Sequence, residues 1–186
     1  MSIVLGGQRV LPATNKLKDV EAILASPFSY MVLLGGHLGQ LKPTVDLAKQ
    51  HGKKVLLHAD LIDGLKNDEY AAEYLCQTIQ PAGIISTRAS VISRTKKNGL
   101  IAIMRLFLID SDALERSFTM LEKQRPDYIE VLPGVIPDVI TEMKERSGIP
   151  IIAGGLIRTN EHVQQALDAG ATAITTSRKE LWRNWK

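Results

Sequence analysis

Cysteine is nearly absent from this chain of 186 residues, because Cys76 is its only cysteine. A single thiol excludes an internal disulfide framework and a cysteine-rich zinc site, and it is typical of a reducing compartment. Long apolar runs are also missing, since no stretch approaches the ~20 residues of a membrane span. The N-terminal MSIVLGGQRVLP has no charged region ahead of an apolar stretch. We therefore expect a cytoplasmic protein that is neither secreted nor bound in a membrane.

Charge of either sign is not in large excess. Lysine and arginine number 23 against 20 aspartate and glutamate residues, a net charge of +3, which permits a nucleic-acid partner without requiring one. Apolar residues make up 45% and charged residues 23% of the chain, which excludes the disordered and low-complexity classes. Because a domain usually takes about 100–200 residues, we expect residues 1–186 to form one domain.

A repeated pattern of short apolar runs extends along the whole chain. The runs are rich in valine and isoleucine, and several are apolar on both faces, as in strands of a parallel sheet covered on both sides. They cover residues 9–11, 30–34, 54–58, 83–86, 101–109, 128–132, 149–153 and 172–176. Helical segments lie between the runs, and four of them end at a glycine, the residue that accepts the left-handed conformation of a helix C-terminus. These glycines are Gly52, Gly99, Gly148 and Gly170.

Strand and helix alternating in this way predict parallel βα units. Eight units close into a (β/α)8 TIM barrel, and because such barrels typically take ~250 residues, this α/β protein would be a minimal one with short loops. An open doubly wound sheet is the alternative, but it needs only five or six strands. In the first unit, we expect the strand to end at Pro12.

Two consecutive units, the seventh and the eighth, carry a phosphate-binding pattern. IIAGGLIRT contains Gly154 and Gly155, and AITTSRKEL contains Thr176 and Ser177. The loops after strands 7 and 8 of a TIM barrel often bind phosphate, through backbone N–H groups that glycine leaves accessible and through hydroxyl donors. Either half alone would be read as a tight turn or a helix cap. Together they predict a phosphate site at these four residues.

Charged and polar residues also interrupt the apolar strands. His58 and Asp60 share one face of the third strand region, because alternate residues of a strand point the same way. Arg105 shares a face with Ile101 and Ile103, and Glu130 interrupts the next strand. A buried arginine and glutamate should be paired, and a structural ion pair would satisfy that requirement. The functional alternative is that His58, Asp60, Arg105 and Glu130 bind the hydroxyl end of a phosphorylated ligand.

Enzymatic alternatives leave few traces in the sequence. A Schiff-base aldolase needs a lysine at an inner strand end, and no predicted strand offers one. A catalytic metal needs several converging carboxylates and histidines, for which His58, Asp60 and Glu130 are a thin set. We therefore expect no metal and no cofactor. An isomerase or lyase acting on a small polyol or sugar phosphate, with Glu130 as the base and His58 as the electrophile, stays open.

Basic residues gather most visibly in TRASVISRTKKNG, which holds no acidic residue. Its four cations, Arg88, Arg94, Lys96 and Lys97, are the best candidates for contacts to a nucleic-acid backbone. A solvated helix face is the simpler interpretation of the same residues.

The chain resembles a known family, the glycerol uptake operon antiterminator regulatory proteins, over nearly its whole length. Six segments carry the resemblance: KKVLLHADLIDGL (53–65), GIISTRASVI (83–92), RLFLIDS (105–111), EVLPGVIP (130–137), IIAGGLIRT (151–159) and TTSRKELW (175–182). Together they are more specific than the two glycines and the Thr-Ser step that phosphate-binding barrels share in general.

This resemblance implies a non-enzymatic barrel that binds glycerol 3-phosphate as its effector. It also implies that the protein binds the leader mRNA of glycerol-metabolism operons, preventing transcription termination and stabilising the message. Ligand binding would then change the RNA affinity, because the ligand binds the RNA-competent state better than the other state. Neither the RNA-binding surface nor a homo-oligomeric state follows from the sequence.

Overall fold

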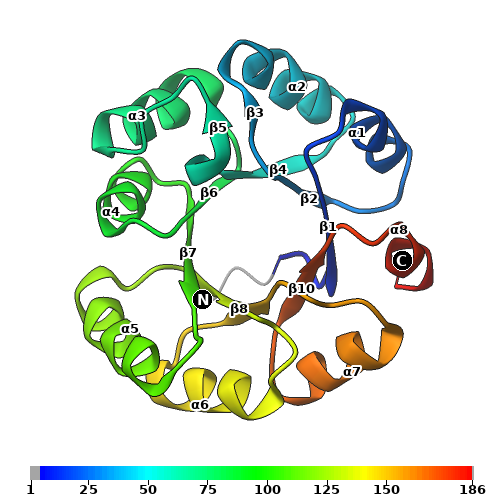
Figure 1. The fold of residues 1–186 in the computed structure, drawn as a ribbon. Helices are drawn as coiled ribbons and strands as arrows, with labels where there is room; N and C mark the ends of the chain where they lie inside the picture. The colour runs from blue at the N-terminus through cyan, green and yellow to red at the C-terminus, as the bar shows by residue number, and fades with distance from the viewer. Residues whose placement is uncertain (1–4, 186) are drawn as a thin grey trace.

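The computed structural model describes residues 5–185, which form a closed barrel of eight parallel strands inside a ring of eight helices (Figure 1). Around the barrel the strands follow the order β1, β2, β4, β6, β7, β8, β9 and β10, and β10 pairs with β1. The predicted (β/α)8 barrel is therefore confirmed. None of the helices in residues 5–185 is both long enough and apolar enough to cross a membrane.

Each barrel strand is followed by a helix of the outer ring. The barrel strands are β1 (Val10–Thr14), β2 (Tyr30–Leu33), β4 (Lys54–His58), β6 (Gly83–Ser86), β7 (Ile101–Phe107), β8 (Tyr128–Leu132), β9 (Ile151–Ala153) and β10 (Ala173–Thr176). The helices are α1 (Leu17–Leu24), α2 (Leu38–Gln50), α3 (Glu69–Tyr74), α4 (Ala89–Lys97), α5 (Ser111–Gln124), α6 (Pro137–Ser147), α7 (Asn160–Asp168) and α8 (Lys179–Asn184). A π-helical turn, Leu75–Ile79, extends α3.

A small second sheet lies outside the barrel, formed by β3 (Gly36–His37) and β5 (Ile62–Asp63). It joins the loops that follow β2 and β4. Gly35 permits this contact, because a Cβ there would lie only 2.1 Å from the carbonyl oxygen of Leu61. The sequence pattern gave no sign of this sheet, since two-residue strands have no periodicity.

The predicted glycines do follow the ends of four helices, whereas the prediction that the first strand ends at Pro12 was wrong. Gly52, Gly99, Gly148 and Gly170 all have positive φ, between 66° and 101°, the region in which glycine avoids the Cβ penalty. Strand β1, in contrast, continues through Pro12 to Thr14. Pro12 is in register with Thr176 of β10, and the pairing with β2 begins only at Ala13. Proline suits an extended backbone and lacks only the N–H donor, so a strand accepts it where no ladder bond is required.

Side-chain alternation along the strands divides the core into two parts. The larger cluster lies between strands and helices, and the smaller one fills the barrel interior with residues such as Leu56, Ile103 and Ile152. The next inward positions toward the carboxyl ends of the strands are polar, because His58 follows Leu56 and Arg105 follows Ile103 at a spacing of two residues. The barrel interior therefore changes from apolar to polar at the end where the βα loops lie.

Candidate functional site

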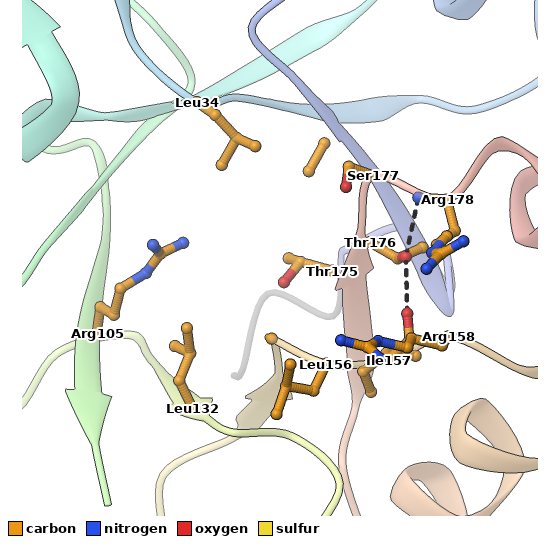
Figure 2. A pocket seen from close by; sticks show the side chains of 12 residues that line it. Leu34, Arg105, Leu132, Leu156, Ile157, Arg158, Thr175, Thr176, Ser177 and Arg178 are labelled. Atoms are coloured by element: carbon orange, nitrogen blue, oxygen red, sulfur yellow. Dashed lines mark hydrogen bonds between the residues drawn. The ribbon is translucent and has the colours of Figure 1, made fainter.

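The barrel opens at the carboxyl ends of its strands into a cavity of about 300 Å³. We call this end of the barrel the mouth. The cavity is lined by residues from the ends of β1, β7, β8 and β10 and from the loops after β2, β9 and β10 (Figure 2). These residues are Ala13, Leu34, Arg105, Leu132, Gly155, Leu156, Ile157, Arg158, Thr175, Thr176, Ser177 and Arg178.

Three of the four predicted phosphate-binding residues line this cavity: Gly155, Thr176 and Ser177. Gly154 is not among them. A Cβ on Gly154 would lie 2.6 Å from Oγ1 of Thr175 and 2.8 Å from Oε1 of Glu130. Gly154 therefore makes room for the contact between those two side chains, and Gly155, with φ of +73°, brings its backbone to the cavity wall.

Thr176 connects the two loops at which phosphate was expected. Its hydroxyl accepts a hydrogen bond from the backbone N–H of Arg178 at 3.1 Å and donates one to the carbonyl oxygen of Ile157 at 3.3 Å (Figure 2). The loop after β9 is thus tied to the loop after β10. Ser177 is exposed at the mouth, so its hydroxyl is accessible from solvent.

The floor of the cavity contains an ion pair between Arg105 and Glu130, the pairing that their burial predicted. Nε of Arg105 lies 2.6 Å from Oε2 of Glu130, and the two side chains are only 11% and 1% exposed. The other carboxylate oxygen of Glu130 accepts a hydrogen bond from the hydroxyl of Thr175 at 2.7 Å. Because Glu130 binds Nε, the guanidinium end of Arg105 points into the cavity (Figure 2), where it can bind an anion or a hydroxyl group.

His58 and Asp60 lie outside the cavity wall. His58 is 2% exposed, and neither of its ring nitrogens has a hydrogen-bond partner in the described part of the chain. Burial and the positive charge of Arg105 lower the pKa of His58 to about 4, so the imidazole is neutral at neutral pH. A neutral imidazole offers one donor and one acceptor to a neighbouring molecule.

Asp60 ties together the loops after β4 and β6. Its carboxylate accepts hydrogen bonds from the hydroxyl of Ser86, from the backbone N–H and hydroxyl of Thr87, and from the side-chain amide of Asn67. Burial alone would raise the pKa of Asp60, but these hydrogen bonds outweigh it and hold the pKa below its ordinary value. With both oxygens bonded within the protein, Asp60 has a structural task in this arrangement.

Three polar residues of the cavity were missed by the sequence reasoning: Thr175, Arg158 and Arg178. Thr175 lies two residues after Ala173, which belongs to the interior cluster, so strand alternation selects Thr175 over Thr176 as the inward residue once Ala173 is known to face the interior. Arg158 and Arg178 each follow a predicted phosphate loop within three residues. A search for cations beside those loops would have found them.

The four basic residues of the TRASVISRTKKNG segment do not come together. Arg88 is exposed at the mouth, immediately before α4, whereas Arg94, Lys96 and Lys97 lie in the last turn of α4 near the opposite end of the barrel. Nη2 of Arg94 lies 3.0 Å from a carboxylate oxygen of Glu69. Nζ of Lys96 donates a hydrogen bond to the carbonyl oxygen of Arg125. The helix thus separates Arg88 from the other three by most of its length.

Possible metal ligands do not cluster in residues 5–185, where no group of three histidine, cysteine or carboxylate side chains is placed to hold an ion. Cys76 is buried. Burial raises the pKa of its thiol to about 11, so Cys76 is not placed to act as a nucleophile.

Comparisons with known proteins identify relatives that are similar in sequence and fold. The E. coli K12 protein YgcP, described as uncharacterized, is 31% identical over 173 residues, which cover 93% of this chain and 91% of YgcP. A glycerol uptake operon antiterminator regulatory protein from Listeria monocytogenes has a solved structure that is 50% identical, with a TM-score of 0.92 over 95% of both chains. A glycerol uptake operon antiterminator-related protein from Thermotoga maritima is 30% identical, with a TM-score of 0.84 over 95% of this chain and 98% of its own.

The strongest assignment comes from a family profile that covers most of the chain. The profile is described as glycerol-3-phosphate responsive antiterminator, and it matches residues 10–182. That range extends from the first residue of β1 into α8 and so includes every strand of the barrel. The chain belongs to the glycerol-3-phosphate responsive antiterminator family.

Proposed function

We propose that this protein is a cytoplasmic, non-enzymatic sensor that binds glycerol 3-phosphate in the mouth cavity and acts on the leader mRNA of glycerol-metabolism operons. The observation that carries the ligand assignment is the guanidinium of Arg105, which Glu130 holds by Nε so that its free end faces the two linked loops. A guanidinium that faces polar loops across a cavity suits a small ligand that carries hydroxyl groups at one end and an anionic group at the other.

The ligand would lie with its phosphate toward the loops after β9 and β10. Gly155, Thr176 and Ser177 supply backbone and hydroxyl groups there, and Arg158 and Arg178 add positive charge at the same wall. The glycerol end would face Arg105, which is held by Glu130. The cavity of about 300 Å³ is of the size that small-molecule sites usually have, about 300–1,000 Å³.

His58 and Asp60 would support the glycerol end from behind the cavity wall. Asp60 keeps the loops after β4 and β6 in place through its hydrogen bonds. His58, with two unpartnered ring nitrogens among the described residues, would exchange hydrogen bonds with the ligand or with water that accompanies it.

An isomerase or lyase built on the same cavity is the second candidate, and the state of Glu130 speaks against it. One carboxylate oxygen is paired with Arg105 and the other accepts from Thr175, so proton abstraction by Glu130 would have to break one of these contacts. None of the residues that line the cavity is a lysine, so a Schiff base has no amine here. Turnover of triose or polyol phosphates would favour the enzyme.

Calorimetric titration with glycerol 3-phosphate tests the ligand site. Ser177→Asp adds a negative charge at an exposed lining residue, and Ser177→Asn is the neutral control of the same size. Two like charges about 4 Å apart repel by about 1 kcal/mol in water and by about 4 kcal/mol near a protein surface. We therefore expect Ser177→Asp to lose at least about fivefold in affinity and Ser177→Asn to lose little. Equal affinities for the two variants would overturn the phosphate assignment.

A gel-shift experiment with the leader RNA of the host's glycerol-uptake genes tests the regulatory part. The wild-type protein should bind this RNA more tightly when glycerol 3-phosphate is present, and binding should weaken as salt is raised. Absence of RNA binding under both conditions, together with turnover of a polyol phosphate, would replace the proposal by the enzymatic alternative.

A further inference from the structure

Large apolar side chains are exposed almost entirely at the mouth of the barrel. Phe107 is 54% exposed at the end of β7, Ile109 is 80% exposed two residues later, and Leu156 is 54% exposed in the loop after β9. Exposed side chains of this kind cost free energy in water and gather where a partner covers them. All three lie at or just beyond the carboxyl ends of barrel strands, and Leu156 also lines the cavity.

Leu132 joins Phe107 and Leu156 into an apolar edge. Strands β7, β8 and β9 are neighbours in the barrel, and Phe107 is in register with Leu132 of β8. Leu132 in turn packs beside Gly155, where a Cβ would lie 3.2 Å from its Cδ2, and Leu156 is the next residue. Because Leu132 and Leu156 also line the cavity, the apolar edge is one border of the ligand site.

Arginines without a carboxylate partner accompany this edge. Arg88, Arg158 and Arg178 are exposed in loops at the mouth, and none makes an ion pair within the described residues 5–185. Glu161 and Glu180, the acidic residues nearest in sequence to Arg158 and Arg178, lie in the first turns of α7 and α8 and are not paired with them. The arginines are therefore available to an anionic partner.

Cations toward the other end of the barrel differ, because several are already engaged. Arg94 is paired with Glu69, Arg146 is paired with Glu115 and Glu142, and Lys96 is bonded to a backbone carbonyl. An RNA strand bound there would have to displace these partners. Charge complementarity thus favours the mouth over the last turn of α4.

We propose that the mouth rim, defined as Arg88, Phe107, Ile109, Leu156, Arg158 and Arg178, docks single-stranded RNA. This inference rests on the proposed function, which it extends by placing the RNA on the surface that borders the ligand. Unpaired bases stack on aromatic and apolar side chains, and arginines contact the phosphates between them. Phe107 provides the aromatic platform, and the three arginines provide the charge.

The same placement explains how a ligand changes RNA affinity. Leu156, Arg158 and Arg178 belong both to the cavity wall and to the mouth rim. A ligand that fixes the loops after β9 and β10 therefore also fixes half of the RNA surface. Since a phosphate dianion neutralises part of the arginine charge, the ligand's favourable effect must come from the ordered loops and from base contacts.

Fluorescence anisotropy with the host's leader RNA, at saturating glycerol 3-phosphate, tests the mouth rim. The variants are Phe107→Ala, Ile109→Ala and Arg88→Gln, none of which alters a residue of the cavity wall. Base stacking on an aromatic side chain is worth about 1–3 kcal/mol, so Phe107→Ala should weaken RNA binding about tenfold. Arg88→Gln should reduce the salt slope by about 1. Calorimetry should show unchanged affinity of these variants for glycerol 3-phosphate.

Two controls come from other surfaces. Tyr74→Ala removes an exposed aromatic side chain of α3, and the double variant Lys96→Gln with Lys97→Gln removes two charges at the end of α4. Both should leave RNA affinity within about twofold of the wild type, a change of less than about 0.5 kcal/mol, because neither surface belongs to the mouth rim. Weak RNA binding by the lysine variant, with normal binding by the three mouth variants, would place the RNA on α4 and overturn the inference while the proposed function stands.

Two further outcomes have separate meanings. A wild-type protein that binds glycerol 3-phosphate but no RNA would refute the proposed function and this inference together. The mouth variants could instead bind RNA with wild-type affinity and, by light scattering without RNA, be monomers where the wild type is a dimer. That result would identify the mouth rim as a contact between two copies of this chain and would overturn the RNA assignment.

Discussion

Arg105→Met removes the cation that faces Glu130 and keeps an unbranched apolar stem of similar length. Glu130 is then left with one partner, the hydroxyl of Thr175 at 2.7 Å. Its side chain is only 1% exposed, so water cannot replace the lost guanidinium without entering the barrel. The variant therefore leaves a buried carboxylate without its counter-charge.

The expected loss of stability follows from this burial. Breaking a buried ion pair by removal of one partner costs about 3–5 kcal/mol. Arg105 is 11% exposed and borders an open cavity, which allows some water to reach the vacated position, so we expect the lower end of that range. In a chain of this size 1 kcal/mol corresponds to about 2–4 °C in Tm. Arg105→Met should therefore lower Tm by about 6–12 °C.

Thermal and urea unfolding followed by circular dichroism measure this loss, and a double-mutant cycle isolates its cause. The double variant, Arg105→Met with Glu130→Gln, leaves no charge at this position and should recover about half or more of the lost stability, because contacting residues couple by about 0.5–3 kcal/mol. If Arg105→Met alone loses less than about 1 kcal/mol, or the double variant is as unstable as the single one, the account of a desolvated ion pair is wrong.

Two further predictions concern groups whose pKa is shifted. The pKa of His58 is lowered from 6.5 to about 4, so the unfolded chain binds a proton at this histidine before the folded protein does as the pH falls. The free energy of unfolding should therefore be highest above pH 6.5 and should fall toward pH 4, by up to about 3 kcal/mol at 1.36 kcal/mol per pKa unit. Urea unfolding across that range should show a steeper pH dependence for the wild type than for His58→Leu, and parallel curves would contradict it. Because burial raises the pKa of Cys76 to about 11, a thiol reagent should label the native protein far more slowly than the urea-unfolded chain; equal rates would show that the thiol is accessible.

The local pattern of the sequence was sufficient for the architecture. Each strand of a parallel barrel is a short apolar run covered on both faces, and four of the helices are followed by a glycine suited to the turn, such as Gly148 with its φ of 66°. These features depend on neighbours in the chain, so periodicity and punctuation contain them. The spacing of two residues also placed Arg105 on the same face of its strand as Ile103.

For the candidate site, the sequence identified the loops that contribute to it but not every side chain that faces the cavity. Gly155, Thr176 and Ser177 reach the cavity wall as expected, because the carboxyl end of every barrel strand faces the mouth. Which side chain of a pair such as Thr175 and Thr176 turns inward is fixed by alternation from a known inner residue. The pattern alone had not identified that inner residue.

The tertiary structure decided what depends on contacts between distant segments. The hydroxyl of Thr175 donates a hydrogen bond to Glu130, which lies 45 residues earlier in the sequence. Position 154 needs a glycine because a Cβ there would clash with this pair of side chains. The separation of Arg88 from Lys96 is by contrast a local effect, since a helix advances about 1.5 Å per residue along its axis. Local rules fix elements and their faces, but the closure of the barrel decides which polar groups meet, and that closure is a property of all eight units at once.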